Sequence, residues 1–376
     1  MKKILLSLFT ILIAGFVLTA CNLEVLEEGL PTASGPQTIK IGFLGPLIGD
    51  VSWLGETAMN GVKLAFEEES NDKYTFEMVA EDDQCDPKQG INAYNKLKSD
   101  GITALIGPEC SSAFLAIAPL AEREQIVAIT PSATNADIAD AGDFIFRVVA
   151  SDSFQGKVVA QAIFDAGFKK VAINTRNDAW GQGLTQVFTE SFTALGGEVV
   201  TTESHEVLAT DLKTQLTKIK NSEAKAIYVP TFAPEMIVML KQMKELGMTD
   251  WKVFGGDAAA DESVATTVGD IAENVVVAQG KENKEGLGQK YEETYLAAYG
   301  KEPQAYSKES YDAARLLAQA IKTVGTDSAG IRDYLYAVQG YQGASGTISF
   351  DAKGEMTEKE VGLYTFRDNK LVDYVK

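Results

Sequence analysis

The sequence is poor in the residues that most enzymes use for chemistry. It has one histidine and three cysteines among 376 residues. His205 lies in the strand-like stretch TTESHEV, far from the strand-to-helix junctions that could hold a ligand, and we expect it on the surface of a strand. Metal centres need clustered His, Cys or acids, and only EDDQCD (81–86) offers one. Its acids are expected to cap the helix that begins at Pro87 or to face solvent.

Sequence motifs of catalysis are also missing. No nucleophile elbow, P-loop, HExxH or Ser-x-x-Lys motif occurs. We therefore expect no enzyme, no cofactor and no metal.

Positive charge is scarce as well. The chain has 34 Lys and Arg against 53 Asp and Glu, a formal net charge of −19. This excludes nucleic acid as a partner, because nucleic acid demands a basic surface, and it excludes polybasic attachment to anionic lipid. Hydrophobic residues make up 45%, enough for a globular protein of one or two domains.

A long apolar run occurs only at the start. MKK is followed by ILLSLFTILIAGFVL, which has the length of a signal peptide rather than of a membrane span. LTAC (18–21) resembles a bacterial lipobox, in which cleavage precedes the cysteine and Cys21 carries lipid. The alternative is an ordinary signal peptide. We expect a signal peptide at 1–20 and a lipid-anchored tether at 21–37. The folded part would then work outside the cytoplasm, held to the membrane only by its lipid.

Two cysteines remain, Cys85 and Cys110. In an oxidising compartment an even pair is most simply a disulfide, and two unpaired thiols are the alternative. A bridge closing this loop stabilises the fold by about 3.5 kcal/mol in the chain-entropy model.

Strand-like and helix-like stretches alternate along the chain, which predicts parallel sheets covered by helices on both faces. Predicted strands are 39–45, 75–82, 102–107, 126–130, 169–174, 197–204, 224–230, 251–256 and 274–280. Predicted helices are 55–69, 87–100, 113–123, 180–196, 211–222, 234–247, 286–300 and 307–324. A β-rich tail follows.

The stretch 146–157 interrupts this rhythm and separates two similar α/β units. The pattern predicts two Rossmann-like lobes, the first from 38–150 plus 279–344 and the second from 151–278 plus 345–376. Three crossings between the lobes would form a hinge.

Ligands in such folds bind beyond the carboxyl ends of the strands. GPECSSAF places Ser111 and Ser112 at a helix N-terminus, where amides and hydroxyls can hold an anion, although simple N-capping gives the same pattern. In TPSATN, Thr134 can donate to the same anion and the Ser132 carbonyl can accept from an ammonium. A Ser/Thr turn is the alternative.

The second unit offers a carboxylate in GGDAAAD. Asp257 can pair with an ammonium, or it can cap the next helix, and Asp261 competes for either role. Donors for a carboxylate and acceptors for an ammonium together describe an α-amino acid site. Four apolar residues, which we expect in loops near strand ends, can wrap an aliphatic side chain or simply pack: Trp53, Leu54, Trp180 and Phe232.

Several stretches carry a resemblance to the leucine/isoleucine/valine-binding proteins, which are type I solute-binding proteins of ABC importers. The similarity runs in order from about residue 38 to 376. Its motifs are QCDPKQGINAYNKL (84–97), GITALIGPECSS (101–112), ITPSATN (129–135), SDSFQG (151–156), WGQGL (180–184) and YVPTFAPEM (228–236).

The resemblance implies roles for individual residues. It implies a disulfide between Cys85 and Cys110, and it implies that Ser111 binds the ligand carboxylate. It also implies a ligand-binding turn of Ser132, Ala133 and Thr134. In that turn the Ser132 carbonyl meets the ammonium and Thr134 meets both charged groups.

The sequence departs from the family's pattern at some of these positions. Asp257 would take the ammonium where leucine-type proteins usually carry Glu. Leu54 stands where the family often has Tyr, and a Tyr is common at the positions of Trp180 and Phe232. These differences bear on the identity of the ligand more than on its class.

We therefore expect an extracytoplasmic solute-binding lipoprotein. It captures an α-amino acid, branched-chain or otherwise aliphatic, and delivers it to the permease subunits of an ABC importer. A sensor module of the same fold is one alternative. A binder of amides or short organic acids is another, against which Asp257 argues because it needs a cationic partner.

Overall fold

The computed structural model describes residues 35–49, 51–357 and 360–375. Cys21, the predicted signal peptide and most of the predicted tether lie outside these residues. Within them, no helix combines the length and the apolar character that crossing a bilayer requires.

The first lobe is built on a five-stranded, all-parallel sheet in the order β2-β1-β3-β4-β5. Its strands are β1 (Gln37–Gly45), β2 (Tyr74–Asp82), β3 (Ala104–Ile106), β4 (Ala128–Thr130) and β5 (Ile145–Arg147). β3 illustrates why both faces are covered: Ala104 and Ile106 point into one core and Leu105 into another. A strand buried on both faces reads as a continuous apolar run, as this one does.

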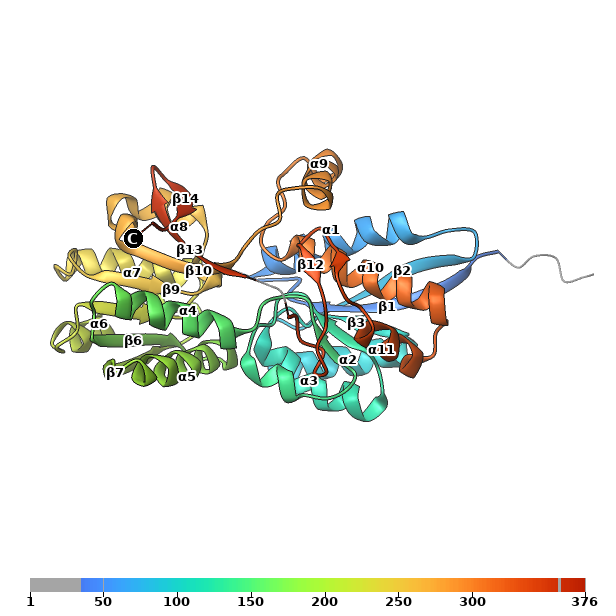
Figure 1. Cartoon of the computed structure of the whole chain (residues 1–376), viewed down its shortest axis with the longest axis horizontal. Helices are drawn as coiled ribbons and strands as arrows, with labels where there is room; N and C mark the ends of the chain where they lie inside the picture. Colours follow the sequence, from blue (N-terminus) through green and yellow to red (C-terminus); the bar gives the residue numbers. More distant parts are fainter. Residues whose placement is uncertain (1–34, 50, 358–359, 376) are drawn as a thin grey trace, which may run out of the picture. The chain divides into compact units, whose positions relative to one another are not determined.

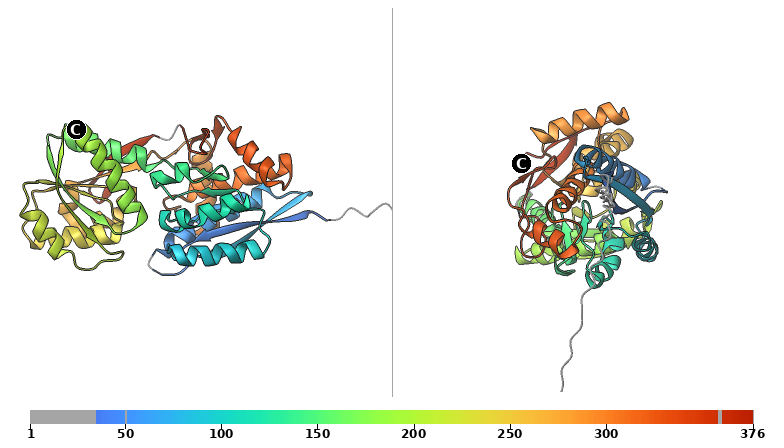
Figure 2. Two further views of the ribbon diagram at one scale, coloured as in Figure 1. Left: turned by 90° about the horizontal axis from the view of Figure 1, so that it is seen from below. Right: turned by 90° about the vertical axis from the view of Figure 1, so that its right-hand side faces the viewer.

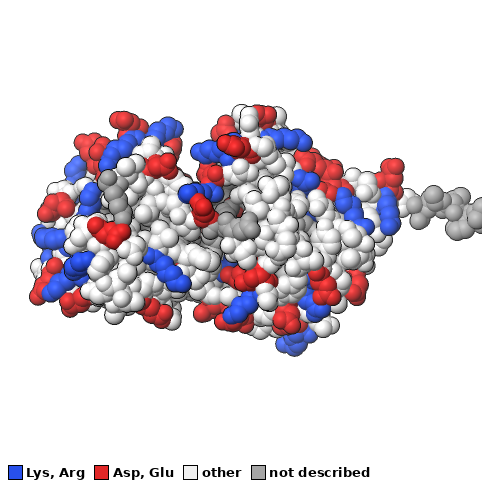
Figure 3. All heavy atoms as spheres, in the orientation of Figure 1, with Lys and Arg blue, Asp and Glu red and all other residues white. Residues whose placement is uncertain are grey.

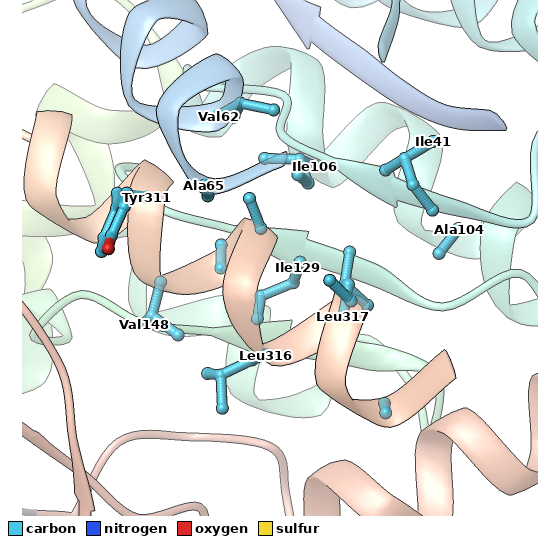
Figure 4. Packing of buried hydrophobic residues seen from close by; sticks show 14 of the residues in the cluster. Ile41, Val62, Ala65, Ala104, Ile106, Ile129, Val148, Tyr311, Leu316 and Leu317 are labelled. Carbon is cyan, nitrogen blue, oxygen red and sulfur yellow. The ribbon is translucent and has the colours of Figure 1, made fainter. Parts of the chain in front are cut away.

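Helices cover both faces of this sheet. They are α1 (Ser52–Glu69), α2 (Pro87–Ser99), α3 (Ser111–Glu124), α9 (Leu287–Tyr299), α10 (Ser307–Val324) and α11 (Ser328–Tyr336). α2 and α3 cover one face, and the other four pack against the opposite one. Figure 4 shows Leu316 and Leu317 of α10 beside Ile129, with Val62 and Ala65 of α1 close by.

The second lobe has a seven-stranded sheet in the order β14-β13-β10-β9-β8-β6-β7. Five of its strands are parallel: β6 (Lys170–Arg176), β7 (Glu198–His205), β8 (Ala226–Val229), β9 (Lys252–Gly255) and β10 (Val275–Gly280). Two are antiparallel: β13 (Val361–Arg367) and β14 (Lys370–Asp373). β13 hydrogen-bonds directly to β10, so the end of the chain completes this lobe (Figure 1).

The helices of the second lobe also form two layers. They are α4 (Asp152–Asp165), α5 (Ala179–Ala194), α6 (Lys213–Lys220), α7 (Ala233–Glu245) and α8 (Glu262–Val268). α4 and α5 cover one face, while α6, α7 and α8 cover the other. Figure 2 shows this sheet between its helices from a second direction.

The chain passes between the two lobes three times. The first passage joins β5 to α4, the second joins β10 to α9, and the third precedes β13. The expected interruption at 146–157 thus contains the end of a strand, a crossing and the first turn of a helix. The two lobes with parallel sheets are those the sequence predicts.

The third passage lies later than the expected boundary at residue 345. The segment with β11 (Tyr341–Gln342) and β12 (Thr347–Ile348) still belongs to the first lobe. Ile348, Phe350 and Met356 are buried in its core, and the Gly354 carbonyl accepts a hydrogen bond from the Arg147 amide. Because these apolar side chains bury against the first sheet, the second lobe resumes only at Val361.

A disulfide joins Cys85 and Cys110, with a Cα–Cα distance of 5.2 Å. It connects the turn after β2 to the residue that precedes α3. Asp86 caps α2 by accepting from the amides of Lys88 and Gln89, in line with the sequence prediction. Asp83 differs from that prediction, because it is fully buried rather than exposed.

The expectation for His205 was wrong. It is the last residue of β7, and its side chain is buried. Its Nδ1 lies 3.2 Å from Asn174 Oδ1 and its Nε2 lies 2.9 Å from Thr231 Oγ1. Burial lowers its pKa to about 4, so the imidazole is neutral. Its place in a strand-like stretch suggested exposure, but Thr231 in the loop before α7 contacts the imidazole at the carboxyl end of the strand.

Candidate functional site

The N-terminus of α3 follows β3 and carries two predicted ligand groups. Ser111 is buried, and its Oγ accepts a 3.3 Å hydrogen bond from the Asn135 amide. Ser112 Oγ accepts a 3.2 Å bond from the Ala179 amide, at the start of α5 in the second lobe. The first amides of a helix lack partners inside the helix and attract anions. Ser111 therefore faces the turn after β4, whereas the hydroxyl of Ser112 contacts the other lobe.

The turn at 130–135 is fastened to the segment before α3. Thr130 Oγ1 donates to the Pro108 carbonyl at 2.9 Å and accepts from the Ala133 amide at 3.0 Å. Ser132 Oγ lies 2.6 Å from the Glu109 carbonyl. The Ala133 methyl is buried in the core, so only the backbone of this residue is available for binding.

Thr134 occupies the part of the turn nearest the second lobe. Its carbonyl accepts a 2.8 Å hydrogen bond from the Asp152 amide at the start of α4. Its buried hydroxyl lowers the pKa of the Asp152 carboxyl, but it does not reach the geometry of a hydrogen bond with any described residue. A buried hydroxyl without a well-formed bond is ready to meet a ligand.

Arg147 holds this turn from inside the lobe. Its side chain is fully buried at the end of β5 and donates to the Asn135 carbonyl at 2.8 Å and the Ala133 carbonyl at 3.4 Å. The same guanidinium pairs with Glu355, which lies just before the third crossing. Sequence reasoning did not identify Arg147, which positions the turn rather than lining it.

The second lobe contributes Asp257, which follows β9 at the start of a short 3-10 helix (Asp257–Ala259). Its Oδ2 accepts a 2.7 Å hydrogen bond from the Tyr306 hydroxyl, and Tyr306 immediately precedes α10 of the first lobe. Its amide donates to Gln155 Oε1 at 3.1 Å. Gly256 leaves room for Gln155, because a Cβ there would lie 2.6 Å from that oxygen.

Asp261 has a different place. It is exposed and caps α8 by accepting from the Ser263 amide at 2.7 Å. Of the two candidate acids in GGDAAAD, only Asp257 contacts the first lobe through a described hydrogen bond. Asp261 is a helix cap.

A second carboxylate, Asp152, joins Asp257. It is fully buried, and neither of its oxygens has a well-formed hydrogen bond among the described residues. Burial raises its pKa well above the ordinary value, the charge of Asp257 raises it further, and Arg147 acts in the opposite direction. Burial likewise raises the pKa of Asp257, while the Tyr306 hydrogen bond lowers it.

Asp257 is half-buried, and a buried carboxylate such as Asp152 beside a second negative charge is stable as an ion only when a cation compensates it. None of the ion pairs among the described residues includes Asp152 or Asp257. The hydroxyl of Tyr228 is also buried without a described partner, and both carboxylates raise its pKa in addition to burial. The two carboxylates and this hydroxyl therefore form an acidic cluster that makes no ion pair with a described residue, although the charge of Arg147 acts on Asp152.

Sequence reasoning missed Asp152, Gln155 and Tyr306. Asp152 and Gln155 lie in SDSFQG (151–156). This stretch carries part of the resemblance, but it interrupts the alternation of strand-like and helix-like stretches. Tyr306 lies in a loop without periodicity, 49 residues from Asp257, and no sequence signal connects the two.

Aromatic side chains of the second lobe lie close to this cluster. Trp180 and Phe232 meet edge to face, with ring centroids 5.4 Å apart. The guanidinium of Arg176 lies 3.9 Å from the Phe232 ring centroid and pairs with Asp178 at 2.7 Å. A Cβ at Gly256 would lie 3.3 Å from Trp180, so this aromatic pair adjoins Asp257.

Three of the four apolar candidates lie in helices rather than in loops, contrary to expectation, whereas Phe232 is a loop residue as expected. Trp180 lies in the first turn of α5 and Phe232 directly precedes α7. Trp53 and Leu54 lie in the first turn of α1, where Leu54 is buried and Trp53 half-buried. Helices begin sooner after the strands than the pattern suggested. No described hydrogen bond or ring contact joins Trp53 or Leu54 to the other candidates.

The site thus brings hydroxyl and amide donors from the first lobe next to two carboxylates at the lobe junction. Such an arrangement can hold a small molecule that carries both an anion and a cation. Among the described residues, no group of three His, Cys, Asp or Glu is arranged to hold a metal ion. On the face drawn in Figure 3, Lys and Arg are interspersed with Asp and Glu, so this face offers a polyanion no continuous basic surface.

Comparison with known proteins shows similarity to amino-acid-binding proteins along most of the chain. The leucine-, isoleucine-, valine-, threonine-, and alanine-binding protein of Pseudomonas aeruginosa is 26% identical over 347 residues, which cover 90% of this chain and 92% of that protein. The leucine binding protein LivK of Thermotoga maritima superposes with a TM-score of 0.81 at 28% identity, covering 90% of this chain and 98% of that one.

LivJ of Streptococcus pneumoniae, solved in complex with isoleucine, superposes with a TM-score of 0.80 at 27% identity, covering 89% of this chain and 98% of that one. A family model described as periplasmic binding protein matches residues 38–370. Because this match spans most of the chain and the two-lobed fold agrees with it, the chain belongs to the periplasmic binding protein family.

Proposed function

We propose that the protein is an extracytoplasmic solute-binding protein that captures an α-amino acid between its lobes for an ABC importer. The observation that carries the proposal is the pair of carboxylates Asp152 and Asp257, one buried and one half-buried, neither of which forms an ion pair with a described residue. An α-ammonium supplies a cation for them. Ser111 and Thr134, with the amides at the start of α3, supply donors for the α-carboxylate.

The side chain of the ligand is proposed to be aliphatic, with a branched-chain amino acid as the first candidate. Trp180 and Phe232 form an apolar surface beside Asp257. Arg176 lies against the Phe232 ring, and its charge is compensated by the ion pair with Asp178. The relatives point the same way, since their names include leucine, isoleucine and valine.

Two alternatives are less well supported. An amide or a short organic acid brings no cation, and its binding would enclose two carboxylates without compensation. A sensor of the same fold would use the same site, so the choice between import and signalling depends on the partner. LivJ of Streptococcus pneumoniae is described as a transporter substrate binding protein, which favours delivery to permease subunits over signalling.

The cellular setting is also part of the proposal. The lipobox-like LTAC supports lipidation at Cys21, and the tether would hold the lobes just outside the membrane. The three crossings support closure by a hinge motion around the ligand. No catalytic step is proposed.

Calorimetric titration tests the proposed function. The full chain, purified in detergent and unfolded and refolded with its disulfide intact to remove bound ligand, is titrated with leucine, isoleucine, valine and then the other amino acids. Micromolar or tighter binding of an aliphatic amino acid is the expected result, with affinity falling for acidic and basic side chains. If no α-amino acid binds while an amide or organic acid does, the proposal is wrong.

A further inference from the structure

The side chain of Glu109 lies where a carboxylate is poorly solvated. It is 2% exposed, and a Cβ at Gly45 would lie 2.9 Å from its Cγ, so it packs against the end of β1. Its Oε1 has no hydrogen-bond partner among the described residues. The charged groups that act most strongly on this carboxyl are Asp83 and Glu309, and both are acidic. A negative charge at Glu109 is therefore costly.

The contact with Ser132 indicates which form Glu109 takes. Ser132 Oγ lies 2.6 Å from Glu109 Oε2 and also 2.6 Å from the Glu109 carbonyl oxygen. Both distances are short for O–H···O hydrogen bonds. A serine hydroxyl carries one proton and can donate it to one of these oxygens. The second contact is a full hydrogen bond only if the carboxyl carries a proton and donates it to Ser132 Oγ.

The surrounding charges favour the same form. Burial raises the pKa of Glu109 to about 8, Ser132 lowers it, and Asp83 and Glu309 raise it. Asp83 lies after β2 and is itself buried, which raises its own pKa to about 7. Glu309 lies in the first turn of α10.

We infer that Glu109 is a positioning residue that acts as a neutral carboxylic acid. Its O–H donates to Ser132 Oγ, and the Ser132 hydroxyl donates to the Glu109 carbonyl. This reciprocal pair locks the turn at 130–135, which presents the Ser132 carbonyl and the Thr134 donors. The inference rests on the proposed function, because it assigns Glu109 to the site that holds the amino acid.

A dependence of binding on pH follows. Loss of the Glu109 proton leaves only the Ser132 proton for the two contacts, so one of the two hydrogen bonds that hold the turn is lost, and a further negative charge is placed beside Asp83 and Glu309. The turn then loses its binding geometry, and the apparent affinity falls with the fraction of protein that retains the proton. Because the neutral form is the competent one, affinity is full below the pKa of Glu109 and falls as the pH rises through it.

The experiment compares the full chain with Glu109→Gln, whose amide keeps a donor and cannot ionise. Amino-acid affinity is measured by calorimetry from about pH 6 to about pH 9.5, and the wild-type protein is expected to lose about 10-fold or more over this range. Glu109→Gln is expected to stay within about 3-fold of the low-pH wild-type affinity and to lose less at high pH. The ligand ammonium titrates equally in both, so the ratio of the two affinities isolates Glu109.

A second variant tests the direction of the charge effect. Asp83→Asn keeps the acceptor for the Cys85 amide but removes a charge that raises the pKa of Glu109. The loss of affinity is expected to move to lower pH. A ratio of wild-type to Glu109→Gln affinity that does not change with pH would overturn the inference.

Infrared spectroscopy separates this inference from the proposed function. The ligand-free wild-type protein at neutral pH is expected to show a protonated-carboxyl band that Glu109→Gln lacks. If no amino acid binds but the band is present, the protonation holds, while the proposed function and the positioning role both fail. If an amino acid binds and the band is absent, the inference alone fails.

Discussion

Replacing Asp257 with Asn is expected to weaken amino-acid binding about 100-fold or more. Removing one partner of a buried charge pair costs about 3–5 kcal/mol, and each 1.4 kcal/mol is a tenfold change in affinity. Asn keeps an acceptor for the Tyr306 hydroxyl and the amide that donates to Gln155. The variant therefore tests the charge rather than the local structure.

Asp261→Asn is the matched control. It changes the same residue type four positions later, in an exposed helix cap. Its affinity, measured by the same calorimetric titration, is expected to equal that of the wild-type protein. Equal losses in both variants, or none in Asp257→Asn, would contradict the assignment of the ammonium to Asp257.

Removing two hydroxyls from the first lobe, with Ser111→Ala and Thr134→Ala together, is expected to abolish measurable binding. Hydrogen bonds to a charged group each contribute about 1.5–3 kcal/mol, so the pair accounts for about 100-fold or more. Both side chains are small and buried, and the fold should persist. Circular dichroism and thermal unfolding check the fold, and calorimetry measures binding.

A double variant elsewhere controls for the loss of buried hydroxyls. Ser349 and Thr365 are buried, and each hydroxyl is hydrogen-bonded far from the ligand turn, to the Gly340 amide and the Val275 carbonyl. Ser349→Ala with Thr365→Ala should cost stability and leave affinity unchanged. Normal affinity in the Ser111 and Thr134 variant would remove both residues from the site.

The alternation of strands and helices predicted most of the fold, because buried parallel strands are continuous apolar runs. The helix α11 was not predicted, and the second lobe was predicted to resume at residue 345, which is too early. The segment around Phe350 has no periodic pattern, and its place in the first lobe depends on packing against a sheet formed far earlier in the chain. A local pattern contains no signal for that contact.

The site was predicted in part for a similar reason. Ser111 and Thr134 follow strand ends, where parallel topology brings side chains together. Asp152 and Tyr306 meet Asp257 only because the chain crosses between the lobes. Their roles therefore depend on the tertiary structure, which no local sequence pattern shows. Arg147 and Glu109 act through backbone and hydroxyl contacts inside the lobe, which spacing does not show.

The central claim is that one site recognises an α-carboxylate and an α-ammonium together. The most direct test is calorimetric titration with three ligands that share one side chain: leucine, its 2-hydroxy acid and its decarboxylated amine. Leucine is expected to bind, and each analogue is expected to bind about 100-fold more weakly or not at all. If the hydroxy acid binds as tightly as leucine, Asp152 and Asp257 do not form an ammonium site, and the account is contradicted.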